Sequence, residues 1–501
     1  MVFFSREITD KEIAQQALNV MKRVASVDRR QNMQKRIDFY NGKQMEYLND
    51  SIDDQFTYPE RLKLQKEYYN STKLVVDELA VLYNEEPLRE IQDGTEQDQE
   101  IYSEIVDSSK INLVMEEANK LCKLCRTVLI RPVWRKEQIE YDIYTPNIFD
   151  VIQDEQDQTK AKAVVYANIF DIKNDIPQNN DDTRTDFDRF DEENVVFYYA
   201  SKDKFIPFTY NLDKTGFVVS KILKQQNNDD NINPYGMLPF IIIRDGYPVS
   251  SFFLEGGDDL INTNEMINVK LTELNHLTKM QAFSVPVRKG AERGADALIL
   301  DPSMCIDLPA DDDLANNADF KFVSPEPKIT ELQKDIEGKL RRLAIKYKLN
   351  PDMFTASAER SSAQSLQLQN YHLSKIIKRD KPYYRIFERE LFELTKVIYN
   401  YHSSGPKLSE NCRLYIDYKD IETPMTMEER DAHNLLLYNN GILSRTRWMM
   451  QENPDIRDKD QAMEMLQEIE EEKKERMAEY VNGEQKQNEE QKEDENKEDD
   501  E

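Results

Sequence analysis

Residues 256–283, GGDDLINTNEMINVKLTELNHLTKMQAF, and residues 328–349, KITELQKDIEGKLRRLAIKYKL, carry the pattern that decides the fold. In both stretches apolar side chains recur at the spacing of one helical face. Each stretch therefore predicts a helix with a single apolar stripe, and the first helix should be about 40 Å long. We expect the two helices to pack on each other and on neighbouring copies of the chain.

A compact segment that predicts short strands separates these helices. Residues 284–327 contain SVPVRKG, ALILDPSMCIDL and DFKFV, joined by glycines and an acidic stretch. Few large apolar residues are present, so a module of this size would be marginally stable alone. We expect it to gain stability by pairing with other copies of itself.

A polar loop and one very long helix follow. Helical spacing resumes near Ser361 and continues to His402, and Pro382 should bend this helix because it removes one backbone donor. The chain before residue 256 predicts several helices and then strands of one sheet from Thr127 to Ile243, where the period changes to two. The chain as a whole is therefore expected to be α+β and mainly helical.

The C-terminal part predicts helices again from Met425 onward. Residues 483–501 contain ten acidic and three basic residues and almost no apolar ones, which is typical of a disordered tail. The whole chain has 501 residues and a net charge of −29, so most of its surface disfavours binding to phosphates or to anionic membranes. An acidic wall is nonetheless compatible with guiding DNA without gripping it.

The sequence predicts no catalytic residue, no cofactor-binding residue and no metal ligand. It contains no GxxxxGK[ST], GxGxxG, HExxH or GxSxG motif, and its four histidines are scattered. Cys122 and Cys125 form one CxxC without a second pair, and we expect both to pack in the core on one face of a helix. The beginning of the chain shows no hydrophobic signal segment, and no apolar run is long enough to span a bilayer. We therefore expect synthesis in a reducing cytoplasm.

The order of several segments resembles the portal, or head–tail connector, proteins of tailed bacteriophages. These segments begin with RIDFYNGKQ at residue 36, NSTKLVVDELAVLYNEEP at residue 70 and MLPFIIIRDG at residue 237. The series is completed by DDLINTNEMINVKLTELNHLTKMQAFSVPVRKG from residue 258, TASAERSSAQSLQLQ from residue 355 and NNGILSRTRWMMQENPDIRD from residue 439. No single segment is diagnostic, whereas their order and spacing over about 430 residues carry the resemblance.

The resemblance implies a portal fold whose named parts follow one another along the chain. They are the wing (residues 1–255 and 361–424), two stem helices (256–283 and 328–348), the clip (284–327), the tunnel loop (349–360), the crown (425–482) and the acidic tail (483–501). It also implies a ring of twelve copies around a DNA channel at one capsid vertex of the virion, through which the genome is packaged and ejected. The expected partners are the large terminase subunit, a head-completion or adaptor protein at the clip, the major capsid and scaffold proteins, and double-stranded DNA that is bound without sequence specificity.

The implied channel residues fall in the tunnel loop and on the stem. In the loop they are Asn350, Met353, Phe354, Thr355, Ser357 and Arg360, and on the stem they are Lys270, Lys279, Lys328, Lys334 and Lys339. The stem lysines are expected either to make weak contacts with DNA or to form ion pairs. The apolar loop side chains either meet neighbouring loops or DNA, or pack into the wing of their own subunit.

Two other classes of function stay open at this point. One is a minor capsid or scaffold protein that forms no closed ring. The other is a carboxylate-dependent nuclease or other DNA-processing enzyme, which would require magnesium-dependent activity. The strand-rich insert between two helices disfavours a purely helical scaffold, and the sequence shows no positioned set of carboxylates for the nuclease.

Overall fold

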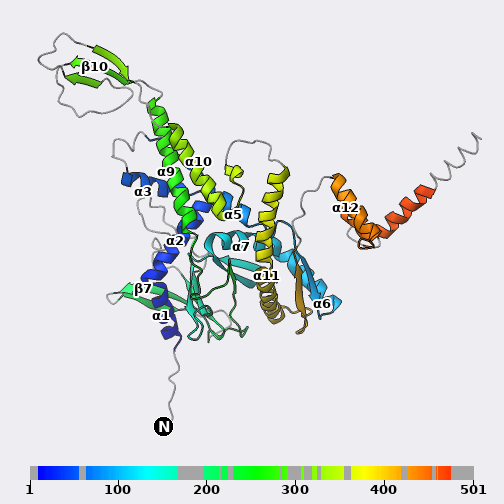
Figure 1. The fold of residues 1–501 in the computed structure, drawn as a ribbon. Helices are drawn as coiled ribbons and strands as arrows, with labels where there is room; N and C mark the ends of the chain where they lie inside the picture. The colour runs from blue at the N-terminus through cyan, green and yellow to red at the C-terminus, as the bar shows by residue number, and fades with distance from the viewer. Residues whose placement is uncertain are drawn as a thin grey trace, which may run out of the picture. The chain divides into compact units, whose positions relative to one another are not determined.

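The chain forms two compact units, Met1–Ile421 and Glu422–Glu501. The computed structural model describes residues 9–55, 64–167, 196–213, 216–223, 230–281, 285–291, 306–309, 319–323, 329–354, 363–418, 427–453, 459 and 461–474. Both helices and sheets build the first unit (Figure 1), so the expected mixed α+β composition is confirmed. Within the described ranges, no helix is both long and apolar enough to cross a membrane.

Among the described residues, six helices precede and flank the first strands. They are α1 (Asp10–Met21), α2 (Val24–Tyr40), α3 (Gln44–Gln55), α5 (Ser71–Leu79), α6 (Glu96–Ser109) and α7 (Ile111–Cys125). Thr9 caps α1. Its side chain accepts a hydrogen bond from the Glu12 backbone N–H, and Glu12 accepts one from the Thr9 backbone N–H.

The strands before residue 245 form two larger antiparallel sheets rather than the one sheet expected. In the first, β3 (Gln138–Tyr144), β2 (Thr127–Arg135) and β9 (Ile241–Arg244) pair in that order. The second is a five-stranded meander. Its strands are β4 (Phe149–Gln153), β5 (Ala161–Ala167), β6 (Phe197–Ser201), β7 (Phe205–Asp213) and β8 (Gly216–Ile222).

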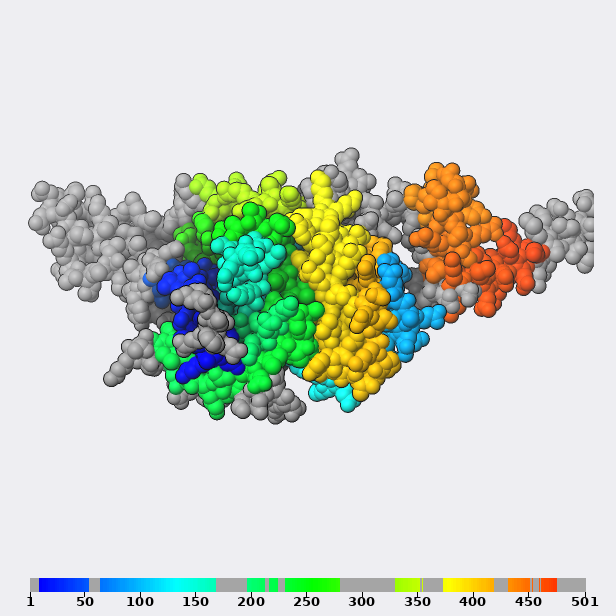
Figure 2. Space-filling view, turned by 90° about the horizontal axis from the view of Figure 1, so that it is seen from below, coloured from blue at the N-terminus to red at the C-terminus, as the bar shows by residue number. Residues whose placement is uncertain are grey.

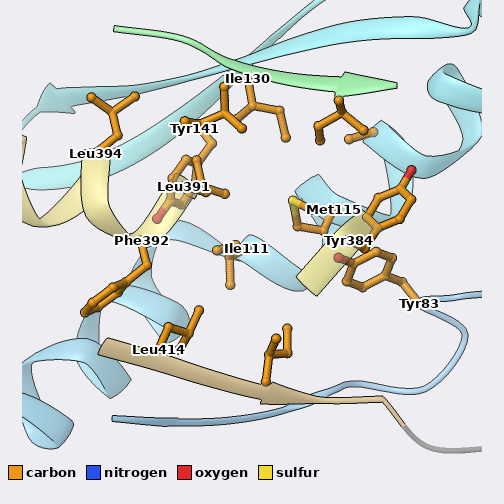
Figure 3. Packing of buried hydrophobic residues seen from close by; sticks show 14 of the residues in the cluster. Tyr83, Ile111, Met115, Ile130, Tyr141, Tyr384, Leu391, Phe392, Leu394 and Leu414 are labelled. Carbon is orange, nitrogen blue, oxygen red and sulfur yellow. The ribbon is translucent and has the colours of Figure 1, made fainter. Parts of the chain in front are cut away.

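A small third sheet joins two segments that lie far apart in the sequence. β1 (Leu88–Gln92) pairs antiparallel with β13 (Arg413–Asp417). Between these strands and the β3–β2–β9 sheet lies the largest apolar cluster, to which α7 contributes Met115 and the long helix α11 (Ala363–His402) contributes Tyr384 and Leu391 (Figure 3). Figure 2 shows α11 and β13, in yellow to gold, lying beside α6 in light blue. The α11 helix continues through Pro382.

The helix pair and the insert that the sequence predicts are both present. α9 (Asp258–Gln281) and α10 (Ile329–Tyr347) lie side by side in Figure 1. The chain between them forms a sheet in which β10 (Val285–Ala291) pairs in parallel with β11 (Ile306–Pro309) and antiparallel with β12 (Asp319–Val323). A short 3₁₀ helix, η1 (Pro351–Phe354), follows α10.

The described part of the second unit is mainly helical. It contains α12 (Met427–Asn439), α13 (Arg445–Glu452) and a further helical stretch at 461–474. Ser444 caps α13 by accepting a hydrogen bond from the Arg447 backbone N–H. The acidic stretch 483–501 lies outside the described residues.

Both cysteines of the CxxC pair are buried, as expected. Residues three apart in a helix lie about 60° from each other around its axis, so the two thiols share one side of α7. Cys122 packs in the cluster of Figure 3, whereas Cys125 packs in a second cluster with α9 and α10. Burial raises the pKa of both thiols, that of Cys125 to about 12, which disfavours the reactive thiolate.

A buried ionic network ties α7, the turn after β9 and α11 together. Lys123 Nζ lies 2.7 Å from Asp245 Oδ1 and 2.6 Å from Asp380 Oδ2, and all three side chains are nearly inaccessible to solvent. Arg126 also pairs with Asp245, and Arg379 reaches Asp245 and Asp380 at 3.2 and 2.9 Å. Each carboxylate therefore meets more than one cation.

Replacing Lys123 with methionine should destabilise the first unit by about 3 kcal/mol, because it leaves two buried carboxylates without their shared partner. Lys120→Met on the same helix is the matched control. Its ion pair with Glu116 at 2.5 Å is partly exposed and should contribute below about 1 kcal/mol. Urea unfolding of both variants measures the difference, and equal losses would contradict the role given to the network.

Candidate functional site: the paired helices and their anchor

α9 and α10 pack antiparallel along a shared apolar seam. Tyr347 near the end of α10 donates a hydrogen bond to Asp259 at the start of α9 at 3.2 Å, and Lys270 Nζ lies 3.0 Å from the Asp335 carboxylate. The seam is the apolar stripe that the sequence predicts. Its buried members on the two helices are Leu260, Ile267, Ile336, Leu340, Leu343 and Ala344.

The pair also carries apolar side chains that do not enter the seam. Met266 on α9 is 50% exposed, and Ile345 on α10 is 61% exposed. The two helices differ in charge as well. α9 contains four acidic and two basic side chains, whereas α10 contains three acidic and five basic ones. The pair therefore combines an acidic helix, a basic helix and exposed apolar groups.

Buried polar side chains anchor α9 to the body. Asn264, Asn268 and Thr272 follow one another at intervals of four residues and are almost completely buried. Asn264 Oδ1 accepts hydrogen bonds from the backbone N–H and the hydroxyl of Thr72, both at 2.9 Å, and its Nδ2 donates to the Tyr69 carbonyl at 2.8 Å.

Asn268 and Thr272 continue the row of buried polar side chains along the helix, and we call the row Asn264, Asn268 and Thr272 the Asn ladder. Asn268 Oδ1 accepts from the Tyr69 backbone N–H at 2.9 Å, and its Nδ2 donates to Gln44 Oε1 at 2.6 Å. Thr272 Oγ1 accepts from the Glu67 backbone N–H at 3.2 Å. A non-helical segment before α5 thus finds its hydrogen-bond partners on a helix face instead of on a strand.

Sequence reasoning missed this ladder because it followed the apolar stripe. The available signal was the spacing N-x3-N-x3-T within NEMINVKLT, which places three short polar side chains on one helical face. Asparagine disfavours helix interiors unless its side chain has a partner, so this spacing in a long helix indicates a buried contact.

A buried arginine fixes the start of α9. Arg36 donates to the Leu124 carbonyl at 3.2 Å, to the Gly256 carbonyl at 2.8 Å and to Asp258 at 2.6 Å. A Cβ at Gly257 would lie 2.8 Å from Arg36 Nη1. Gly257 has a φ of +97°, and its neighbour Gly256 has a φ of +93°. Glycine is therefore required where α9 leaves the body.

The predicted stem lysines occupy different environments. Lys270 pairs with Asp335 across the seam. Lys279 and Lys334 are exposed, and Lys339 is half-buried. Lys328 lies outside the described residues. The lysines do not come together as one cluster.

The predicted tunnel loop is described in its first part. Asn350 is half-buried, and Met353 lies within η1. Phe354 is 9% exposed and packs in the same cluster as the α9–α10 seam. In the single chain, therefore, Phe354 contacts its own subunit. Thr355, Ser357 and Arg360 lie outside the described residues, and channel contact of this loop stays a prediction.

Within the described residues, no group of three or more His, Cys, Asp or Glu side chains is placed to hold a metal ion. His402 stacks on Trp134 with ring centroids 5.8 Å apart, and its Nε2 lies 2.8 Å from the Tyr235 hydroxyl. Burial lowers the pKa of His402, in keeping with a neutral packing role.

Comparisons with known proteins place the chain in no family. No family model matches it. No curated protein matches the sequence. Among solved structures, a chain from the "Virion of native gene transfer agent (GTA) particle" aligns with 75% of this chain and 86% of its own length, at 10% identity and a TM-score of 0.34. A TM-score of this size carries no argument, so the proposals below rest on the residues and geometry of this chain.

Replacing Asn268 with leucine should test the anchor. The change keeps the side-chain volume but leaves the Tyr69 N–H and Gln44 Oε1 buried without this partner, at a cost of roughly 2–4 kcal/mol. Asn275→Leu is the control, because Asn275 makes one exposed hydrogen bond, to Glu67. Hydrogen exchange should quicken at residues 64–72 in Asn268→Leu alone, and identical exchange in the two variants would contradict the anchor.

Proposed function

We propose that this protein is a non-enzymatic structural component of a virion, the portal at one capsid vertex. In this role, copies of the chain form a closed ring around a channel through which double-stranded DNA is packaged and ejected. The observation that carries the proposal is the anchored α9–α10 pair. Its apolar seam is buried within the subunit, whereas its surface carries an acidic helix, a basic helix and exposed apolar side chains.

The surface of the pair supports head-to-tail assembly. A ring forms when two different faces of one chain are complementary and the rotation between copies closes. The acidic α9 and the basic α10 are complementary in charge, and Met266 and Ile345 supply apolar area for the contact. We propose that α9 of one copy packs against α10 of the next.

The charge of the chain supports passage of DNA rather than tight binding. Every phosphate that a protein neutralises releases counterions and increases affinity, and high affinity would slow a sliding duplex. A chain with a net charge of −29 disfavours such binding over most of its surface. The sequence also contains no phosphate-binding motif of an ATPase, which suits a channel driven by the large terminase subunit.

The channel-facing residues belong to the proposal. Lys270, Lys279, Lys328, Lys334 and Lys339 on the stem would supply weak, spaced contacts with the duplex. The loop from Asn350 to Arg360 would narrow the channel, with Phe354 packed on its own subunit as the fixed base of that loop.

The small sheet between the helices is proposed as the docking element. It forms within one chain from β10, β11 and β12, and β11 and β12 are its two edges. Unpaired strand edges present backbone donors and acceptors to other chains. The terminase and later a head-completion protein would bind at this clip, while the major capsid and scaffold proteins would bind the wing.

A charge placed in the proposed interface should prevent ring closure. Ile345→Glu introduces an acidic side chain at an exposed apolar position of α10 and should reduce the assembly from a ring to species of one or a few copies, measured by mass photometry. Leu113→Glu on α7 is the control, because Leu113 is 62% exposed and undergoes the same chemical change. An unchanged ring in Ile345→Glu, or equal loss in the control, would contradict this interface.

A further inference from the structure

A basic pocket of about 330 Å³ lies where the seam helices meet the body. Its walls are the end of α7, the first turn of α9, the end of α10 and the part of α11 around Ile376. The cationic side chains that line it are Lys123, Arg126, Lys346, Lys348, Lys375 and Arg379. Such a concentration of positive charge is unusual in a chain with a net charge of −29.

The carboxylates around the pocket do not balance these cations. Asp245 and Asp259 line it, and Asp380 lies behind it in contact with Lys123 and Arg379. Even with Lys375 left out of the count, five cations meet three carboxylates. The pocket therefore keeps an excess of positive charge.

The pocket has a buried floor and an accessible rim. The Lys123 side chain is 3% exposed, whereas those of Arg126, Lys346 and Arg379 are 32%, 61% and 56% exposed. Arg126 Nε is buried and has no hydrogen-bond partner within the described part of the chain. The exposed side chains at the rim are the donors that an incoming anion would reach.

Backbone geometry adds to the attraction. Lys348 follows α10 with a φ of +60°, the left-handed conformation that ends the helix and turns the chain. The first turn of α9, including Leu260 and Ile261, forms one wall, and N–H groups in a first turn carry partial positive charge. The helix start alone would not define a site, but it reinforces the side-chain cluster.

We propose that this pocket binds a phosphate group. Arginine and lysine donors converging on a small open cavity suit the several oxygens and double charge of a phosphate better than the single charge of a carboxylate. The phosphate comes either from a free small anion or from the DNA backbone. The site depends on one chain's residues, so it stands whether or not the chain forms a ring.

Binding of inorganic phosphate to the full-length protein tests the site. Titration followed by ³¹P NMR, at constant ionic strength with chloride as the reference, should show saturable binding. Lys348→Glu, and separately Lys375→Glu, should weaken it on the order of tenfold or more. Lys11→Glu is the matched control, because it reverses the charge of an exposed lysine on α1 that does not line the pocket, and it should keep wild-type affinity.

The same titration separates the sources of phosphate. Displacement of bound phosphate by a short duplex without terminal phosphates would assign the pocket to the DNA backbone, and its absence would assign it to a free anion. Non-saturable binding, equal weakening in Lys11→Glu, or equal binding of acetate would overturn the proposal. Ring formation is measured separately, so failure here leaves the proposed function standing.

Discussion

The buried amides of α9 constrain the rest of the first unit. Asn264 and Asn268 are inaccessible to water, so each must find hydrogen-bond partners within the protein. They find them in Gln44, the first residue of α3, and in the backbone of residues 69–72, which fixes α9 against the start of α3 and the start of α5. One face of α9 makes these polar contacts, and another face packs against α10 in the apolar seam. The helix pair therefore depends on the buried hydrogen bonds of α9 as much as on its apolar stripe.

This division of faces explains how the pair can serve both folding and assembly. The seam and the ladder hold the helices within the subunit, which leaves Met266 and Ile345 on the surface. Charged side chains divide unequally between the two helices, so neighbouring copies can meet acidic face to basic face. The basic pocket lies at the base of the same pair, where α10 ends and α9 begins. Structural anchoring, the proposed ring contact and the proposed phosphate site thus share one element.

Much of the fold could be predicted from the sequence because its periodicities are long and regular. The helix at Asp258–Gln281, the return helix at Ile329–Tyr347 and the strand-forming insert follow directly from spacing. Two sheets in place of one could not be foreseen, because strand partners are set by contacts such as β2 with β9, about 110 residues apart in the sequence. The strands β1 and β13 lie even farther apart in the sequence, and neither strand was predicted. Of the candidate site, Lys270 and Lys279 lie on α9 and Lys334 and Lys339 lie on α10, as the spacing predicts. The polar spacing on α9 marks a buried contact, but the partners of Asn264 and Asn268 and the lining of the pocket depend on tertiary packing that no local pattern encodes.

The central claim is that copies of this chain close into a ring around a channel. Mass photometry of the purified protein with negative-stain imaging tests it most directly. The account predicts a closed ring with a central hole and a mass near twelve times 59.1 kDa. A chain that stays monomeric at high concentration would contradict it and would direct attention to magnesium-dependent nuclease assays.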